Sequence, residues 1–206
     1  MYVITSSGLS PGRDHLSVGL AAVRGGAAAL QLRAPELDDE DLLRVALALA
    51  KGCAPRGVLF VVNDRVDVAG EAGADGVHLG QGDELEGARD RIGPDRVLGV
   101  SVSTAEEARR AERAGADYVG VTVWPTPTKP EATPQGLDGI RAIAGATALP
   151  IVGVGGIDAS NAGDVIAAGA AGVAVVSAVG AASDPVEATR ALVRAVERAE
   201  PPAAPG

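Results

Sequence analysis

Two aspartates, Asp64 and Asp83, are the first residues whose type and spacing suggest chemistry. Asp64 directly follows the apolar run Val58–Asn63, and Asp83 lies shortly after the next run, Gly76–Leu79. If these runs are neighbouring parallel strands, both carboxylates lie at the same edge of the sheet. Paired carboxylates beside phosphate oxygens suit a hard divalent cation such as Mg²⁺, which prefers oxygen ligands and keeps several waters. The alternative for each aspartate is a helix cap or loop residue.

A cationic, hydroxyl-rich segment is Thr126-Pro127-Thr128-Lys129-Pro130. Its prolines restrict the loop and reduce the entropy lost when the loop is ordered. Lys129 provides a point charge suited to a diphosphate, although a solvated surface lysine is the alternative. Arg33 ends another apolar run, and an inward-pointing arginine needs an anionic partner.

The glycine pair in Val154-Gly155-Gly156-Ile157 is expected to bind phosphate. It ends an apolar run and is predicted to open a helix whose first turn carries Asp158, so that backbone N–H groups can approach an anion. The segment Gly172–Val179 can supply further N–H groups around Ser177. A simple tight turn is the alternative for the two glycines.

The histidines and the cysteine are expected to be structural. His15 and His78 are the only histidines. For His78, a hydrogen-bonded structural imidazole is favoured over catalysis. The single cysteine, Cys53, excludes a disulfide framework and a cysteine zinc cluster within the chain, and we expect it to be a small apolar residue near a helix end.

Composition limits the class of protein. The 206 residues are 47% hydrophobic and 22% charged, which fits a globular chain with one substantial core. A net charge of −9 argues against nucleic-acid or membrane partners, and 2% aromatic residues leave few platforms for base stacking. We see no membrane helix and no signal peptide, and we therefore expect a cytoplasmic location.

Short apolar runs alternate with longer helical patterns along the chain. The runs are apolar at nearly every position, as in parallel strands buried on both faces. This alternation predicts an α/β fold, a single (β/α)8 TIM barrel over residues 1–199, with 200–206 as a disordered tail. A doubly wound open sheet is the alternative. The predicted strands are Tyr2–Thr5, Ala29–Arg33, Val58–Asn63, Gly76–Leu79, Val97–Val102, Tyr118–Thr122, Ile151–Val154 and Val173–Ser177, and the clearest helices are Asp38–Cys53, Thr104–Ala114, Asp158–Ala168 and Asp184–Ala199.

A repeated Gly-Ala phrase supports closure of the barrel. It begins at Gly26, Gly73, Gly115 and Gly169, and each copy precedes an even-numbered predicted strand. We expect each glycine to end a helix in the left-handed conformation. Because active sites of such barrels lie at the carboxyl ends of the strands, the polar residues found there are the candidate site.

Taken in order, these motifs resemble the thiamine phosphate synthase family, within the synthase and thiazole tautomerase superfamily. The resemblance covers nearly the whole chain. Each motif is weak alone, but their order and spacing together are specific. The motifs are Gln31-Leu32-Arg33, Asn63-Asp64-Arg65-Val66-Asp67, Gly76-Val77-His78-Leu79-Gly80-Gln81-Gly82-Asp83, Gly99-Val100-Ser101, Pro125-Thr126-Pro127-Thr128-Lys129, Val154-Gly155-Gly156-Ile157 and the segment around Val176-Ser177.

The resemblance implies a transferase that joins 4-amino-2-methyl-5-(diphosphooxymethyl)pyrimidine to 4-methyl-5-(2-phosphooxyethyl)thiazole, with release of diphosphate. It implies Mg²⁺ ligands at Asp64 and Asp83, and catalytic roles for Lys129, Arg33 and Ser101. The residues matching the pyrimidine diphosphate site are Gln31, Arg33, Asn63, Ser101 and Lys129, and those matching the thiazole phosphate site are Thr126, Thr128, Gly156, Val176 and Ser177.

Two positions depart from the family pattern. Pro35 stands where the family usually has Lys, so one diphosphate contact is missing or is supplied elsewhere, with Arg65 as a candidate. Ser103 stands where the family often has His. The alternatives are a thiazole tautomerase, which uses that His, and a non-catalytic phosphate-binding barrel. The oligomeric state is left open, with a homo-oligomer as one option.

Overall fold

The strands form a closed parallel barrel in the computed structural model, which describes residues 1–200. Each strand pairs with the next, and β8 pairs with β1, which excludes the open sheet and confirms the TIM barrel. The expected tail lies outside the described residues except for Glu200. The strands are β1 (Tyr2–Ile4), β2 (Ala29–Leu32), β3 (Leu59–Asn63), β4 (Gly76–Leu79), β5 (Val97–Ser101), β6 (Tyr118–Thr122), β7 (Ile151–Val154) and β8 (Gly172–Val175).

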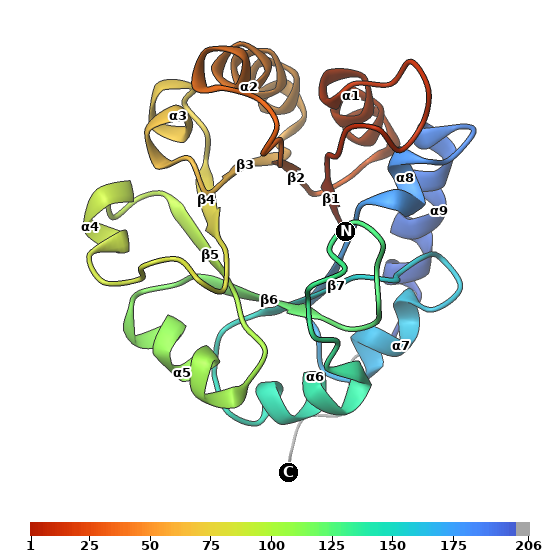
Figure 1. Cartoon of the computed structure of the whole chain (residues 1–206). Helices are drawn as coiled ribbons and strands as arrows, with labels where there is room; N and C mark the ends of the chain where they lie inside the picture. Colours follow the sequence, from red (N-terminus) through yellow and green to blue (C-terminus); the bar gives the residue numbers. More distant parts are fainter. Residues whose placement is uncertain (201–206) are drawn as a thin grey trace.

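The helices surround the barrel (Figure 1). They are α1 (His15–Gly25), α2 (Asp39–Cys53), the 3₁₀ helix η1 (Ala54–Arg56), α3 (Val66–Glu71), α4 (Ala88–Ile92), α5 (Ala105–Arg113), α6 (Gly136–Ala144), α7 (Ala162–Ala167), α8 (Ser177–Gly180) and α9 (Pro185–Glu197).

Side-chain caps start the helices close to where the sequence predicts. The Asp38 carboxylate accepts the Asp41 N–H at 2.9 Å, and the Asp184 carboxylate accepts two N–H groups of α9. Thr104 Oγ1 accepts the Glu107 N–H at 3.1 Å, but the Glu107 carboxylate accepts the N–H of Ser103 rather than that of Thr104. Thr104 and Glu107 therefore form only half of a capping box at the start of α5.

The predicted start of α7 is wrong. Asp158 does not begin a helix: its carboxylate accepts the N–H of Ser160 at 2.7 Å and the Ser160 hydroxyl at 2.6 Å. This local turn competes with helical hydrogen bonding, and α7 begins only at Ala162.

The repeated Gly-Ala phrase ends four helices in the same way. Gly26, Gly73, Gly115 and Gly169 have φ values of 90°, 65°, 82° and 112°. In every copy the alanine N–H after the glycine bonds to a carbonyl five residues back, for example Ala116 to Ala111 at 3.0 Å. These bonds satisfy carbonyls at the helix end, so the expected left-handed helix termini are confirmed.

The apolar core has two parts. The larger part fills the space between strands and helices and includes Cys53, which is 1% exposed, as expected of an apolar residue. The smaller part lies inside the barrel, where Tyr2, Val61, Tyr118 and Ala174 meet. Within residues 1–200, no helix has the length and hydropathy needed to cross a membrane.

Candidate active site

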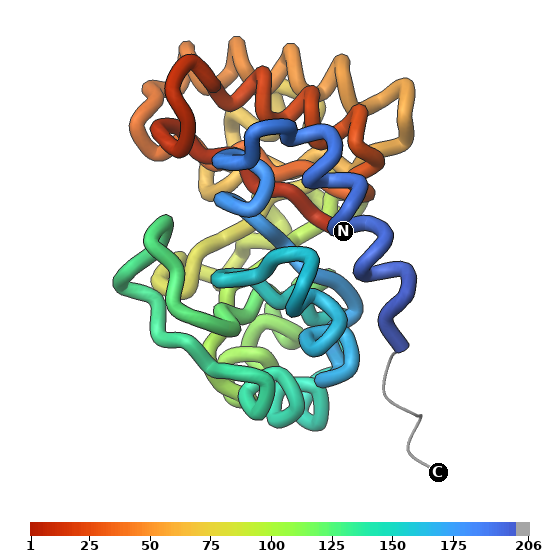
Figure 2. The backbone as a smooth tube through the Cα atoms, turned by 90° about the vertical axis from the view of Figure 1, so that its right-hand side faces the viewer, coloured from red at the N-terminus to blue at the C-terminus, as the bar shows by residue number. Residues whose placement is uncertain are grey.

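A pocket lies at the carboxyl ends of the strands, above the tyrosines of the inner core. Figure 2 shows the green β6–α6 loop projecting at one end of the barrel, while the last turn of α9 lies toward the other. Among the residues that line the pocket are Gln31, Arg33, Asn63, Asp64, Ser101, Thr126, Thr128, Lys129, Gly156, Val176 and Ser177. All the predicted site residues except Asp83 therefore face one cavity.

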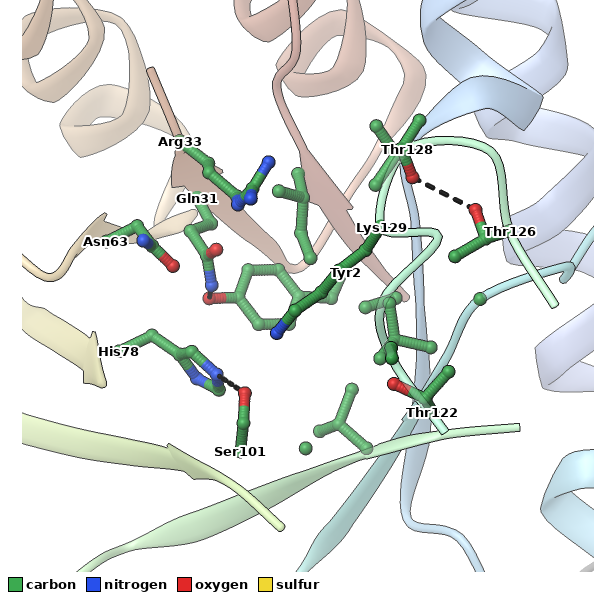
Figure 3. Close-up of a pocket in the computed structure, with 18 of the residues that line it drawn as sticks. Tyr2, Gln31, Arg33, Asn63, His78, Ser101, Thr122, Thr126, Thr128 and Lys129 are labelled. Carbon is green, nitrogen blue, oxygen red and sulfur yellow. Dashed lines mark hydrogen bonds between the residues drawn. The ribbon is translucent and has the colours of Figure 1, made fainter. Parts of the chain in front are cut away.

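Five side chains form a hydrogen-bonded row at the base of the pocket, here called the polar chain. Gln31 Nε2 donates to the Tyr2 hydroxyl at 2.8 Å, and the Tyr2 and Tyr118 hydroxyls are 3.1 Å apart. His78 Nδ1 lies 2.9 Å from the Tyr118 hydroxyl, and its Nε2 lies 2.9 Å from Ser101 Oγ. The polar chain joins predicted site residues of β2 and β5 through β1, β6 and β4. Figure 3 shows its two ends, Gln31 beside Tyr2 and His78 beside Ser101.

The inner part of the polar chain is uncharged at neutral pH. Burial and, to a smaller extent, the nearby Lys129 cation together lower the pKa of His78 to about 4 against the opposing effect of Asp83. Burial raises the pKa of the Tyr2 phenol to about 12, and it raises the pKa of Tyr118 well above its usual range. His78 is thus an uncharged imidazole with both ring nitrogens hydrogen-bonded, as expected of a structural histidine, and it also lines the pocket.

Two glycines in the strands make room for this row. A Cβ at Gly99 would overlap the Tyr118 ring, and a Cβ at Gly120 would lie 3.2 Å from His78 Cε1. Gly99 and Tyr118 are paired across β5 and β6. The missing side chain on one strand therefore accommodates the aromatic ring of its neighbour.

Arg33 and Lys129 reach into the pocket from opposite sides (Figure 3). Among residues 1–200, neither cation lies within 4.0 Å of a carboxylate oxygen. The backbone N–H of Arg33 donates to Thr5 Oγ1 at 3.3 Å, and the backbone N–H of Lys129 donates to the Thr126 carbonyl at 3.4 Å. The backbone is thus anchored at both residues while the charged groups remain available for an anion.

The buried hydroxyl of Thr5 belongs to a second polar group beside the site. His15 Nδ1 lies 2.9 Å from Thr5 Oγ1, and His15 Nε2 lies 2.7 Å from the Glu36 carboxylate. His15 is 4% exposed and joins the start of α1 to the β2–α2 loop. It therefore supports the strand end that carries Arg33.

The structure shows what surrounds Pro35. Pro35 is exposed on the β2–α2 loop. The Arg65 guanidinium pairs with the Asp39 carboxylate and donates to the Leu37 carbonyl at 3.4 Å. Arg65 does not line the pocket, so it does not replace the lysine expected at position 35.

Asp64 and Asp83 lie together at the rim. Asp83 accepts the Gly80 N–H at 2.5 Å, and a Cβ at Gly80 would lie within 4.0 Å of both carboxylates. Burial raises the pKa of Asp64, and the charge and hydrogen bond of Asp83 raise it further against the opposing Arg33 cation. Asp64 is also the one non-glycine residue of 1–200 with positive φ, at 62°. Asp64 is therefore subject both to backbone strain and to repulsion from the Asp83 charge.

The carboxylate pair is suited to Mg²⁺. No cluster of three or more His, Cys, Asp or Glu side chains occurs in the described part of the chain. Mg²⁺ is usually held by one or two carboxylates together with substrate phosphates, so two ligands suffice beside an anion site. The pKa of Asp64 is raised by burial first and by the neighbouring Asp83 charge second, and a bound cation would offset both effects.

The glycine pair packs tightly against the β6–α6 loop. Gly155 and Gly156 have φ values of 89° and 66°. A Cβ at Gly156 would lie 2.8 Å from Trp124 Cβ, and one at Gly155 would lie 2.9 Å from the Trp124 carbonyl oxygen. Because α7 starts at Ala162, these glycines are not at a helix N-terminus as predicted. Their conformation and packing require glycine whether or not phosphate binds there.

The hydroxyls of the β6–α6 loop are close to this turn. Thr126 Oγ1 and Thr128 Oγ1 are 3.0 Å apart, and both line the pocket beside Ser177, the first residue of α8. The loop is closed by bonds from the Gln135 N–H to the Thr122 carbonyl and from the Gly136 N–H to the Val123 carbonyl. The hydroxyls of Thr126, Thr128 and Ser177 and the two glycines thus line the same pocket.

Tyr2, Tyr118 and Gln81 line the pocket but were missed in the sequence. Both tyrosines are the first residues of their strands, and they are the only tyrosines of the chain. Their place at the start of two predicted strands was the only sequence signal that could have drawn attention to them. Gln81 donates to both oxygens of Glu107, at 3.0 and 3.1 Å, and the Glu107 carboxylate also accepts the Ser103 N–H at 2.6 Å.

Comparison with known proteins assigns the family. A profile of thiamine monophosphate synthase matches residues 1–179. The thiamine-phosphate synthase of Moorella thermoacetica is 46% identical over 97% of this chain and 96% of its own, and that of Natronomonas pharaonis is 47% identical over 98% and 96%. The solved thiamine phosphate pyrophosphorylase of Pyrococcus furiosus has a TM-score of 0.88 and 39% identity, covering 96% of this chain and 95% of that one. The chain therefore belongs to the thiamine monophosphate synthase family, the transferases that form thiamine phosphate by condensation.

Proposed function

We propose that this enzyme joins 4-amino-2-methyl-5-(diphosphooxymethyl)pyrimidine to 4-methyl-5-(2-phosphooxyethyl)thiazole and releases diphosphate. The observation that carries the proposal is the pair of cations, Arg33 and Lys129, which enter one pocket without an acidic partner among residues 1–200. Two positive charges facing one space suit a substrate with a highly charged leaving group.

The two substrates are assigned to opposite walls of the pocket. The polar wall, formed by β2–β5, supplies amide, hydroxyl and cationic groups for the pyrimidine diphosphate, together with Lys129 of the β6–α6 loop. The other wall supplies hydroxyls and glycine backbone for the thiazole phosphate. The first set is Gln31, Arg33, Asn63, Ser101 and Lys129, and the second is Thr126, Thr128, Gly156, Val176 and Ser177.

Bond cleavage is driven by stabilisation of the leaving group. Arg33 and Lys129 neutralise the charge that develops on diphosphate as the methylene C–O bond breaks. The aminopyrimidine delocalises the positive charge left on its methylene carbon. The thiazole nitrogen then forms the new C–N bond and has no proton to lose, so the reaction needs no strong general base. The uncharged, hydrogen-bonded His78 is consistent with this.

Asp64 and Asp83 would hold Mg²⁺ at the rim of the pocket beside the diphosphate. When bound, the cation supplies further neutralisation of the leaving group. Positioning and electrostatics by Arg33, Lys129 and Ser101 provide the remainder of catalysis. No residue of the site has to form a covalent intermediate.

The test combines purified protein, Mg²⁺ and both substrates, and measures diphosphate and thiamine phosphate. Equal amounts of both products support the proposal. Conversion of the thiazole between its tautomers without diphosphate would favour the tautomerase alternative. Binding of either phosphate without any turnover would favour the non-catalytic barrel.

A further inference from the structure

We propose that the polar chain has a single hydrogen-bond direction, running from Gln31 to Ser101, which fixes which end of it donates to the substrate. Tyr2, Tyr118 and His78 are then positioning residues. The nature of the ligand rests on the function proposed above, but the direction is a property of the protein alone.

The direction is set at the Gln31 end. The Gln31 amide nitrogen lies 2.8 Å from the Tyr2 hydroxyl and can only donate. The Tyr2 oxygen therefore accepts, and its own proton is left for the Tyr118 hydroxyl, 3.1 Å away. No other side-chain partner of Tyr2 occurs within residues 1–200, so donation to Tyr118 leaves no buried proton unpaired.

The direction then passes through the imidazole. Tyr118 accepts from Tyr2, so its single proton goes to His78 Nδ1 at 2.9 Å. A neutral imidazole with Nδ1 as acceptor carries its proton on Nε2. That proton is donated to Ser101 Oγ, which lies 2.9 Å from Nε2. One tautomer of His78 satisfies every member of the polar chain.

The surroundings of the two tyrosines and His78 maintain the direction, because they keep the phenols protonated and the rings in place. Burial raises the pKa of both phenols, so neither loses its proton at neutral pH. Gly99 and Gly120 leave space for the Tyr118 and His78 rings, which lie 5.5 Å apart between centroids. The rings are therefore held in place by close packing as well as by hydrogen bonds.

The two ends of the polar chain consequently present opposite groups to the pocket. Ser101 accepts from His78 and keeps its own proton for a ligand acceptor. Gln31 uses one of the two N–H groups of its amide nitrogen on Tyr2, and its carbonyl oxygen is left to accept from a ligand donor. An aminopyrimidine carries a donating amino group beside ring nitrogens that accept, so it complements both ends. If the hydrogen bonds ran from Ser101 to Gln31 instead, the Gln31 carbonyl oxygen would accept from Tyr2 and only its N–H groups would face the ligand. Ser101 would then have donated its proton to His78 and could only accept from the ligand.

The tautomer of His78 tests the direction without any ligand. We expect nitrogen NMR of ¹⁵N-histidine-labelled protein near neutral pH to show His78 protonated on Nε2 and unprotonated on Nδ1. The chain has two histidines, so His78→Gln or His15→Gln identifies the signals. A wild-type His78 protonated on Nδ1 would overturn the proposal, whatever the variants do.

A matched pair of variants tests the coupling. Tyr118→Phe removes the hydroxyl that donates to Nδ1, so the tautomer should no longer be fixed. Tyr2→Phe keeps the Tyr118–His78 contact but disconnects it from the Gln31 amide that sets the direction, so the tautomer should no longer be fixed in this variant either. Thermal unfolding of both variants checks that the barrel is intact. An unchanged tautomer in folded Tyr118→Phe would contradict the inference.

The substrate readout separates this inference from the proposed function. In Tyr118→Phe we expect KM for the pyrimidine diphosphate to rise about tenfold while kcat changes little, as for the loss of one oriented hydrogen bond. KM for the thiazole phosphate should not change. Wild-type protein that releases no diphosphate would refute the proposed function and leave the tautomer result standing.

Discussion

The two walls of the pocket are built differently. The wall formed by β2–β5 presents polar side chains that are held by other side chains, as Ser101 is held by His78. The wall formed by β6–β8 presents Val152, Val154 and Ala174 with two glycines, and its shape is set by backbone packing against Trp124. Hydrogen-bonded side chains allow recognition of charge and polarity, whereas close backbone packing sets shape. Changes to the first wall should therefore affect turnover or binding of the pyrimidine diphosphate, and changes to the second should affect binding of the thiazole phosphate.

The largest effect is expected from the two carboxylates at the rim of the pocket, beside the polar wall. Asp64→Ala and Asp83→Ala should each lower turnover roughly a thousandfold, because several kcal/mol of charge stabilisation would be lost with Mg²⁺. Steady-state diphosphate release measures this, and thermal unfolding should show an intact barrel. Activity of the wild type should disappear with a chelator and return with Mg²⁺. Full activity in excess chelator would refute the metal site.

Lys129→Ala should have the next largest effect, because Lys129 crosses from the β6–α6 loop toward the polar wall (Figure 3). If it stabilises the leaving diphosphate, kcat should fall more than KM rises, by about 30- to 1000-fold for roughly 2–4 kcal/mol. Arg198→Ala on the exposed end of α9 is a matched control, since it also removes one cation. A variant within a factor of about two of wild type would show that Lys129 is a solvated surface residue.

The fold was largely predictable because its signals are local. Apolar runs gave all the strands, and the Gly-Ala phrase gave four helix ends whose glycines have positive φ. The start of α7 was not predictable, because the Asp158 carboxylate can cap a helix or close a turn with Ser160, and sequence does not distinguish the two.

The candidate site was predictable where a polar residue ends an apolar run. Arg33, Asn63 and Asp64 stand out against the strands before them. Tyr2 and Tyr118 did not, because a tyrosine at the start of a strand is equally consistent with core packing. Their contact across 116 residues of sequence appears only when β1 and β6 face one another inside the closed barrel.

The shape of the second wall is tested by a pair of glycines. Gly156→Ala places a Cβ 2.8 Å from Trp124 Cβ at φ 66°, whereas Gly136→Ala has nearly the same φ, 64°, with nothing within 4 Å. Backbone strain should destabilise both by about 1–2 kcal/mol. Only Gly156→Ala should displace the β6–α6 loop and weaken binding of the thiazole phosphate, measured by calorimetry. Equal thiazole phosphate affinities in the two variants would show that this packing does not shape the site.

The smallest effect is expected at Pro35, where the polar wall lacks a charge that the family usually has. Proline donates through neither its side chain nor its nitrogen, and Arg65 is occupied by Asp39 and the Leu37 carbonyl. Pro35→Lys should therefore tighten the pyrimidine diphosphate by about 1 kcal/mol and leave thiazole phosphate affinity unchanged. Titration of each ligand against wild type and variant decides the matter. An unchanged diphosphate affinity would mean that a lysine on this exposed loop does not reach the pocket. A changed thiazole phosphate affinity would instead mean that the two substrates have been assigned to the wrong walls.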